Sequence, residues 1–535
     1  MLDLLIKNAS VIDGTGTPRR KEALGVHNGK LVLHPEENAP AAEVIDAEGL
    51  VVCPGFIDAH CHEDETLGNP TSMLAKLSQG ITTVCGGQCG SSWFPVPTDP
   101  EKFMLFTRLR SAFLGDPECG FKEAYKSFTS MEGYRSYLQT RPMAYNFTVL
   151  TGHSELRIAA MGVENRRPTP AELDKMKALL RETMEHGSRG LSAGLIYSPS
   201  CYAEKEELVE LCKVVAEFDG VYAVHLRNEA GLFVESVQEA MDICREAGCR
   251  LNLSHHKVCG KENWGKSEIT LKMIADARAS GMKVYTDVYP YTATGSNLNI
   301  CLPKEFFANG PVRTHELLKD PAVRAELKEQ VLNNSEGRYR NCGGWENILI
   351  CGAPNTPAAE NRTVAEYARS IGKDVWEAYF DLLVDNGSAA QAAYFAMSED
   401  ELCRILKDDN ICICTDSYDV RTGNAVHPRS YGAFPHALGY FVREKQLMPL
   451  ETMIMKMTGK PAEFMELAGK GLIRDGFDAD LVLLNPDTVD ARADFRNARA
   501  LSVGIERVLV AGETVYQNGQ LTGKTPGVFL PYRGR

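Results

Sequence analysis

Residues 55–64 read GFIDAHCHED, and this stretch decides how the rest of the chain is interpreted. An apolar run that ends in His-x-His is typical of a buried strand whose last alternate side chains, His60 and His62, leave the same face. Two imidazoles on one face can bind a single metal ion. The pattern also occurs at ordinary polar strand ends, so the remaining segments of the chain have to decide between the two interpretations.

Seven more apolar segments follow, and stretches with helical spacing separate most of them, for example residues 169–187 and 204–220. The eight candidate strands lie near residues 56, 83, 149, 192, 223, 252, 285 and 413. Eight strand and helix units predict an α/β fold of the (β/α)8, TIM-like barrel type. The alternative is a doubly wound open sheet, but no glycine-rich dinucleotide motif follows the first strand.

Short strand patterns occupy both ends of the chain. Residues 1–54 alternate apolar and polar positions, and Asn28-Gly29 is a strong hairpin signal. Similar patterns return in residues 471–535. We therefore expect a small β-sandwich built from both termini around a catalytic barrel at 55–470.

One connection within the barrel is unusually long. Residues 289–409 separate the seventh and eighth candidate strands and include the helical pattern EYARSIGKDVWEAYFDLLVDNG. This is too long for a structureless loop. We expect an inserted, lid-like helical subdomain that covers the site.

The composition excludes several classes of protein. The 535 residues are 44% hydrophobic and 24% charged, with a formal net charge of -13, which is ordinary for a globular protein and unfavourable for a nucleic-acid partner. Asp3 and Lys7 interrupt the apolar N-terminal stretch, so we expect no signal peptide, and no apolar run reaches the ~20 residues that span a membrane. The sixteen cysteines are then expected to be reduced thiols in a cytoplasmic protein. The oligomeric state stays open.

Side chains that suit zinc gather at the carboxyl ends of the predicted strands, where a barrel of this kind has its active site. They are His60 and His62 on the first strand, Cys89 after the second, His225 on the fifth, His255 on the sixth and Asp416 on the eighth. Six such groups at one end of different strands predict a metal site far more strongly than any single motif.

Two of these positions have competitors in the sequence. Cys85 lies within the second strand, whereas Cys89 lies in a glycine-bracketed loop that can approach a ligand closely, so Cys89 is preferred. His256 follows His255 and must point to the other side of its strand, so only one of the two can face the site.

Ten motifs spread along the chain form a recognisable set. They read GFIDAHCHED, GITTVCGGQCG, GLSAGLIYSPSCYA, VHLRNE, LSHHK, NWGKS, DVYPYTA, HPRSYGAFPHALG, GLIRDGFDADLVLL and TGKTPG. In these motifs the chain resembles the N-acyl-D-amino-acid deacylases, or D-aminoacylases, of the amidohydrolase superfamily. The resemblance implies a metal-bearing barrel with a small β-sandwich from both termini.

The resemblance also implies a set of metal ligands. Cys89, His225 and His255 would hold a tightly bound zinc, while His60 and His62 would form a second, weaker position. Many members of the superfamily bridge two metals with a carboxylated lysine on the fourth strand. That strand reads GLSAGLIYS here and offers no lysine, which fits a cysteine-bridged variant.

Further residues receive catalytic and binding roles from the same resemblance. Asp416 matches the aspartate that serves as general acid and base, which suits an amide because its leaving nitrogen must be protonated. The residues that would hold the substrate carboxylate are Lys257, Tyr289, Ser296 and Arg429. The planar fork of an arginine is well matched to a carboxylate.

These observations predict a zinc-dependent amidohydrolase that cleaves the linear amide of an N-acyl-D-amino acid, with a small molecule as its partner. The alternative among enzymes is a cyclic-amide hydrolase of the hydantoinase or dihydroorotase type. The missing fourth-strand lysine and the HPRSYG motif argue against it. A catalytically inactive interaction protein is a further alternative, although every expected ligand is present in the sequence.

Overall fold

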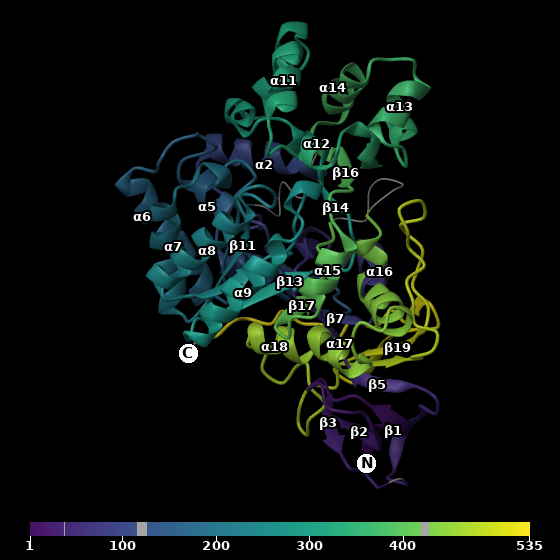
Figure 1. Ribbon diagram of the computed structural model, residues 1–535. Helices are drawn as coiled ribbons and strands as arrows, with labels where there is room; N and C mark the ends of the chain where they lie inside the picture. The colour runs from purple at the N-terminus through teal and green to yellow at the C-terminus, as the bar shows by residue number, and fades with distance from the viewer. Residues whose placement is uncertain (37, 115–125, 419–426, 535) are drawn as a thin grey trace.

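Parallel strands surrounded by helices form the centre of the molecule (Figure 1). The computed structural model describes residues 1–36, 38–114, 126–418 and 427–534. The central strands are β6 (Phe56–Asp58), β7 (Ile81–Gly86), β8 (Asn146–Val149), β9 (Thr151–Gly152), β10 (Gly190–Gly194), β11 (Val221–His225), β12 (Arg250–Leu253), β13 (Val284–Val288) and β17 (Ile411–Ile413). Only Leu150 separates β8 from β9, so these strands supply the eight predicted positions, which are confirmed.

The central strands pair in parallel and in chain order, and their two ends meet. The order is β6-β7-β8 and then β9-β10-β11-β12-β13-β17. Just beyond β6 and β17, the Asp416 backbone N–H donates to the His60 carbonyl at 2.9 Å. The buried Lys76 ammonium adds a second link, because it lies 2.7 Å from both Asp58 Oδ2 and Ser417 Oγ. The sheet therefore closes into the predicted barrel.

Helices flank the barrel strands. They are α1 (Pro70–Leu77), α2 (Pro100–Leu114), α4 (Met131–Leu138), α5 (His153–Ala160), α6 (Pro170–Glu185), α7 (Lys205–Glu217), α8 (Phe233–Ala247), α9 (Lys266–Ala279), α15 (Glu399–Leu406), α16 (Arg429–His436), α17 (Leu450–Met457) and α18 (Gly459–Phe464). In α6, Thr169 and Glu172 form a capping box that fixes the first turn. Met176, Leu180 and Met184 then recur at four-residue spacing and are buried, so this face packs on the strands.

A nine-stranded sheet from both chain ends lies below the barrel in Figure 1. Its strands are β1 (Leu2–Val11), β2 (Arg20–His27), β3 (Lys30–Leu33), β4 (Ala41–Asp46), β5 (Val51–Pro54), β18 (Leu481–Leu484), β19 (Ile505–Val510), β20 (Glu513–Gln517) and β21 (Gln520–Leu521). β18 pairs with β5, which joins the two termini. The predicted turn at Asn28-Gly29 connects the antiparallel strands β2 and β3.

The end of the chain leaves this sheet and returns to the barrel. Gly527 N donates to Met143 O at 2.9 Å, and Leu530 N donates to the carbonyl of Phe147 in β8 at 2.7 Å. Tyr532 N donates to Gly187 O, beside the start of β10. Residues 526–532 therefore contact the barrel. The division of the chain at residues 54 and 470 stays a prediction.

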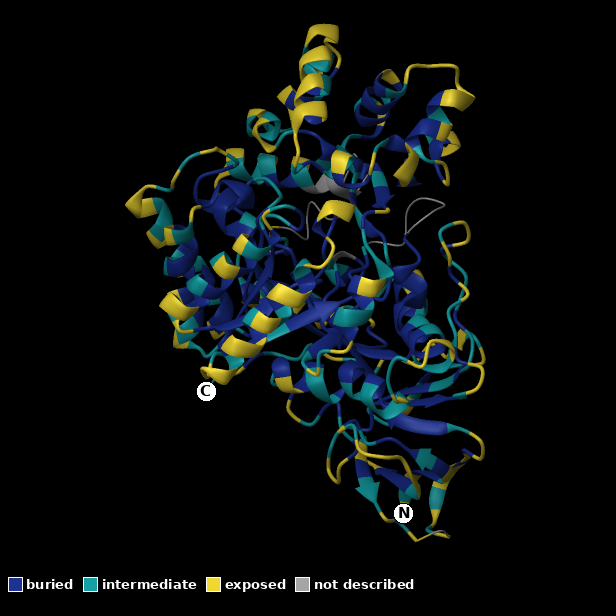
Figure 2. Cartoon of the chain, viewed as in Figure 1, coloured by how far each residue is buried: buried dark blue, intermediate teal, exposed yellow. Residues whose placement is uncertain are grey.

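The long connection between β13 and β17 forms a compact insertion above the strands (Figure 1). Its elements are β14 (Thr294–Asn297), η4 (Leu298–Cys301), η5 (Lys304–Asn309), α10 (Gly310–Leu317), α11 (Pro321–Asn333), α12 (Arg338–Asn341), β15 (Ile348–Gly352), α13 (Val364–Ser370), α14 (Val375–Asn386), η8 (Gly387–Ala389) and β16 (Gln391–Tyr394). The insertion is thus part helical and part a three-stranded antiparallel sheet, and it has a hydrophobic core of its own. Figure 2 shows the barrel strands as largely buried and α11 as mostly exposed.

Two further features of the described residues concern their helices and their cysteines. None of their helices is both long enough and apolar enough to cross a membrane. The fifteen cysteines among them are all free thiols, and fourteen of these are buried.

Candidate metal centre and active site

Cys89 occupies the centre of a buried group of metal-ligand atoms. Its Sγ lies 3.4 Å from His60 Nε2, 3.6 Å from His225 Nδ1 and 3.4 Å from His255 Nε2. His60 follows β6, Cys89 follows β7, His225 ends β11 and His255 follows β12, so four barrel strands deliver these atoms to one point. The structure therefore brings the predicted ligands together.

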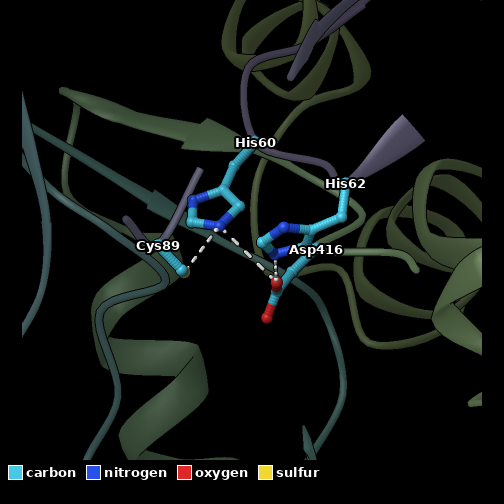
Figure 3. A group of neighbouring side chains, drawn as sticks. All are labelled: His60, His62, Cys89 and Asp416. Atoms are coloured by element: carbon cyan, nitrogen blue, oxygen red, sulfur yellow. Dashed lines mark hydrogen bonds and ion pairs between the residues drawn. The ribbon is translucent and has the colours of Figure 1, made fainter. Parts of the chain in front are cut away.

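The ligand atoms fall into two groups that share Cys89. One group contains Cys89, His225 and His255, and the other contains Cys89, His60, His62 and Asp416. Figure 3 shows the second group, whose side chains point toward one another. Asp416 Oδ1 lies 3.2 Å from His62 Nε2 and 3.5 Å from His60 Nε2.

The donor set fits zinc in both chemistry and spacing. With zinc bonds of about 2.0–2.1 Å to nitrogen and 2.3 Å to sulfur, the edges of a ligand tetrahedron are about 3.4–3.6 Å long. The sulfur-to-nitrogen separations around Cys89 have this length. Thiolate and imidazole ligands also suit zinc better than magnesium or calcium, which prefer oxygen.

Three residues of the site have a strained backbone. Cys89 has φ +52°, His255 has φ +36° and Asp416 has φ +47°. Side chains other than glycine rarely adopt this region, and such strain is typical of residues whose direction matters for function. The strain aims each side chain into the cluster just beyond the end of its strand.

Charges around the cluster favour the ionised forms of Cys89 and Asp416. Burial alone would raise the pKa of the Cys89 thiol, but His60 and His255 hold it well below its usual range, as a thiolate requires. Burial would likewise raise the pKa of Asp416, yet Arg429 and His62 hold it well below the usual value. The site therefore presents an ionised Asp416.

Arg429 is the ion-pair partner of this aspartate. Its Nη1 lies 2.7 Å from Asp416 Oδ2, and the residue is only 1% exposed. Its Nε and Nη2 atoms are buried and form no hydrogen bond to a group in the described part of the chain. A buried guanidinium with unused donors can bind an anion next to Asp416.

Lys257 is buried and contacts residues next to the metal-ligand cluster, so its role is not limited to contact with substrate. Its Nζ is 2.6 Å from His255 Nδ1 and forms a short contact with Glu229 Oε1. Arg338, which begins α12 of the insertion, approaches the other oxygen of Glu229 at 3.2 Å. Glu229 also lies 3.4 Å from His225 Nε2, so one carboxylate connects both histidines to two cations.

The remaining predicted substrate residues, Tyr289 and Ser296, lie beside a small polar cavity next to Asp416. Tyr289 faces Arg429, whose guanidinium carbon is 4.6 Å from the ring centre. Ser296 lies in β14, with its hydroxyl 3.2 Å from Tyr197 Oη. Lys257, Tyr289, Ser296 and Asp416 line this cavity, and Arg429 lines a second small cavity that shares Ser296 and Tyr418 with it.

Two acidic residues of the site were not identified from the sequence. Glu229 is the first, and Asp287 at the end of β13 is the second. Asp287 Oδ1 lies 3.2 Å from His60 Nδ1 and accepts a hydrogen bond from His255 N at 2.7 Å. Such carboxylates orient ligand histidines. Both residues lie in motifs that the resemblance rests on, VHLRNE and DVYPYTA, and this was the available signal.

The closed barrel and its buried cluster of cysteine, histidine and aspartate side chains define a metal-dependent hydrolase. The chain belongs to the amidohydrolase family, whose model matches residues 43–323 and 357–516. The segment between the two matched stretches, 324–356, falls within the insertion.

Relatives over the full length make the family membership more specific. The chain is 35% identical to an N-acyl-D-aspartate deacylase of Alcaligenes xylosoxydans xylosoxydans, across 99% of this chain and 95% of that protein. It is 34% identical to a D-aminoacylase of the same organism, across 99% and 97%. A crystal structure of N-acyl-D-glutamate deacylase from Bordetella bronchiseptica, complexed with zinc and a phosphonate inhibitor, is 33% identical with a TM-score of 0.82 and covers 99% of both chains.

Proposed function

We propose that the chain is a zinc-dependent hydrolase that cleaves the linear amide bond of N-acyl-D-amino acids, giving a carboxylic acid and a free D-amino acid. The observation that carries this proposal is the position of Cys89 between two groups of ligand atoms, at separations that match a zinc tetrahedron. The full-length relatives, which are deacylases of D-amino acids, support the substrate class.

The ligand roles follow the same division. Cys89, His225 and His255 would hold the tight zinc, and His60 and His62 a second, weaker position that shares Cys89. A zinc ion bound by these residues would polarise the amide carbonyl and lower the pKa of a bound water toward ~7. Asp287 forms a hydrogen bond with the second ring nitrogen of His60, and the Glu229 carboxylate lies 3.4 Å from the second nitrogens of His225 and His255, where its charge favours their orientation.

Asp416 supplies proton transfer. It is ionised and buried beside His62, so it can accept a proton from the attacking water and later donate it to the departing nitrogen. Arg429 keeps it ionised before substrate arrives. When the substrate carboxylate binds Arg429, part of this stabilisation is lost, which raises the pKa of Asp416 and makes its carboxylate a stronger base toward the attacking water.

The polar cavity would anchor the substrate carboxylate. Arg429 offers free donors in the adjoining small cavity that Ser296 also lines, and its guanidinium lies over the Tyr289 ring. Lys257 contributes positive charge while it stays paired with Glu229. The carboxylate is therefore held on the side of Asp416 that faces away from His62.

The cyclic-amide alternative finds no support in the site. β10 consists of Gly-Leu-Ser-Ala-Gly and places no lysine near the cluster, and Cys89 lies where the two ligand groups meet. The inactive-protein alternative is equally unsupported, because all of the predicted ligand atoms converge.

The function is tested with zinc-loaded protein and a panel of N-acetyl-D- and N-acetyl-L-amino acids that carry acidic, apolar and basic side chains. We expect release of free amine from D substrates, at least 100-fold slower release from L substrates, and loss of activity on chelation that zinc restores. Hydrolysis of hydantoins or dihydroorotate without cleavage of any linear amide would contradict the proposal.

A further inference from the structure

A large apolar cavity opens directly beside the metal-ligand cluster. It has a volume of about 370 Å³ and reaches Cys89 and His62 at its inner end. We call it the apolar chamber, and its main lining residues are Leu109, Ile158, Val163, Ile300, Phe307 and Leu383. These residues come from the α2 and α5 side of the barrel and from η4, η5 and α14 of the insertion, so the insertion forms its roof.

The described residues that line the apolar chamber include two carboxylates and no buried cation away from the metal-ligand cluster. Asp64 and Glu155 line it, and both carboxylates accept backbone hydrogen bonds, from Gly87 N at 2.9 Å and Ser92 N at 3.0 Å. Among the described lining residues, the cationic groups away from the metal cluster are Lys304, which is exposed, and His315, which is partly exposed. A buried carboxylate deep in the chamber would find no buried cation among them.

The small polar cavity next to Asp416 contrasts with the apolar chamber. It is lined by Asp416, Lys257, Arg338 and Ser296, has little free volume, and adjoins a second small cavity that Arg429 lines. The small polar cavity and the apolar chamber meet at Tyr197 and Tyr418. A substrate that places its carboxylate at Arg429 and its amide at the cluster must therefore extend any large remaining group into the apolar chamber.

The chamber is much larger than an acetyl group. A volume of 370 Å³ falls in the range of pockets that bind drug-sized ligands, about 300–1,000 Å³. An acetyl group places one methyl beyond the scissile carbonyl and would leave nearly all of this space to water. Pockets of this size and lining usually bury most of an apolar ligand.

We propose that the apolar chamber binds an extended apolar group of the substrate, carried as a long acyl chain or as a bulky D-amino-acid side chain. This inference rests on the proposed deacylase function. It separates the chain from its relatives that are named for aspartate and glutamate, whose substrates carry a second carboxylate.

Two substrate series distinguish the sources of the apolar group. The first varies the acyl group of D-alanine from acetyl through butyryl and hexanoyl to octanoyl, and the second varies the side chain of N-acetyl-D-amino acids from Ala to Leu, Phe and Asp. We expect kcat/KM to rise about fourfold per buried methylene in at least one series, and N-acetyl-D-Asp to be a poor substrate. Two flat series, or a preference for Asp, would overturn the inference while leaving the deacylase function intact.

A matched pair of variants assigns the effect to the chamber. Ile300→Arg places a charge in its wall, whereas Val312→Arg changes a 57% exposed residue of α10 in the same insertion. We expect Ile300→Arg to lower the ratio of kcat/KM between octanoyl and acetyl substrates at least tenfold, and Val312→Arg to leave it as in the wild type. Equal ratios in both variants would contradict the assignment.

A binding measurement tests the chamber even if no amide is cleaved. Octanamide, a neutral apolar probe, should raise the midpoint of thermal unfolding of the wild type, and acetamide at the same concentration should not. Ile300→Arg should abolish the octanamide shift. If octanamide gives no shift with wild type, the chamber does not bind apolar chains and the inference fails. Absence of all amide hydrolysis would instead count against the proposed function.

Discussion

At the scale of single residues, Cys89 is the residue that the other candidate ligands surround. Its sulfur faces three imidazoles, and its left-handed backbone conformation aims it at them. Cys85, four residues earlier, instead contacts Gly86 O and Gln88 Nε2, and burial raises the pKa of its thiol. A neutral buried thiol is a poor zinc ligand.

Cys89→Ala should therefore lose the tightly bound zinc, whereas Cys85→Ala should keep it. Metal content of the purified variants, measured by elemental analysis beside thermal unfolding curves, makes the comparison. If Cys89→Ala retains a full equivalent of zinc, the assigned ligand is wrong.

Asp416→Asn should lower kcat by at least about 100-fold, because the amide cannot accept the proton of the attacking water. The zinc held by Cys89, His225 and His255 should remain. Asp276→Asn, a change of a 66% exposed carboxylate on α9, is the control that should retain wild-type kcat. Near-normal turnover of Asp416→Asn would exclude its proposed role.

At the scale of elements, the loop after β11 connects three parts of the fold. Glu229 in this loop lies 3.4 Å from His225 Nε2 at the end of β11 and 3.4 Å from His255 Nδ1 after β12. It also binds Arg338 of α12, in the insertion. The position of the insertion is thus linked, through Glu229, to the two histidines that we propose as metal ligands.

Glu229→Gln should weaken zinc binding about 10- to 100-fold. The change removes the carboxylate behind both histidines and leaves Lys257 and Arg338 as uncompensated cations near the metal. Glu239→Gln on α8, whose wild-type carboxylate pairs with the partly exposed Arg227, is the matched control. Competition with a chromophoric chelator measures both affinities, and equal values would show that Glu229 does not position the ligands.

Elements were the easiest level to predict from the sequence. The eight barrel strands are short and buried, as in β7, where every residue is buried, and their apolar runs alternate with helical patterns such as that of α6. The insertion was expected to be helical, yet β14, β15 and β16 form a sheet within it. The GSN and QAAY segments of β14 and β16 lack a strong strand pattern, and long-range pairing determines their conformation.

At the scale of the whole molecule, the two ends of the chain support the barrel differently. The N-terminal strands join the C-terminal ones in the nine-stranded sheet, whereas residues 526–532 run along β8 and beneath the barrel. There the Tyr532 hydroxyl accepts from Arg250 Nη2 at 2.8 Å and donates to Asp219 O at 2.8 Å. This end of the barrel is opposite the metal-ligand cluster.

Truncation after residue 525 should therefore lower the midpoint of thermal unfolding by on the order of 5 °C, because Phe529 and Tyr532 lose their packing. Tyr532→Phe, which removes only the hydroxyl, should cause a smaller decrease. Differential scanning calorimetry makes the comparison. An unchanged midpoint after truncation would show that the tail does not stabilise the barrel.

The sequence by itself predicted the barrel, the pairing of the two termini and the residues proposed as metal ligands, because apolar periodicity and strand ends are local properties of the chain. Only the tertiary structure decided which charged side chains form ion pairs with one another. Lys257 pairs with Glu229, Arg429 pairs with Asp416, and the apolar chamber forms where the insertion covers the barrel. These contacts join segments that are distant in sequence, and their energies depend on burial and geometry that no local pattern records.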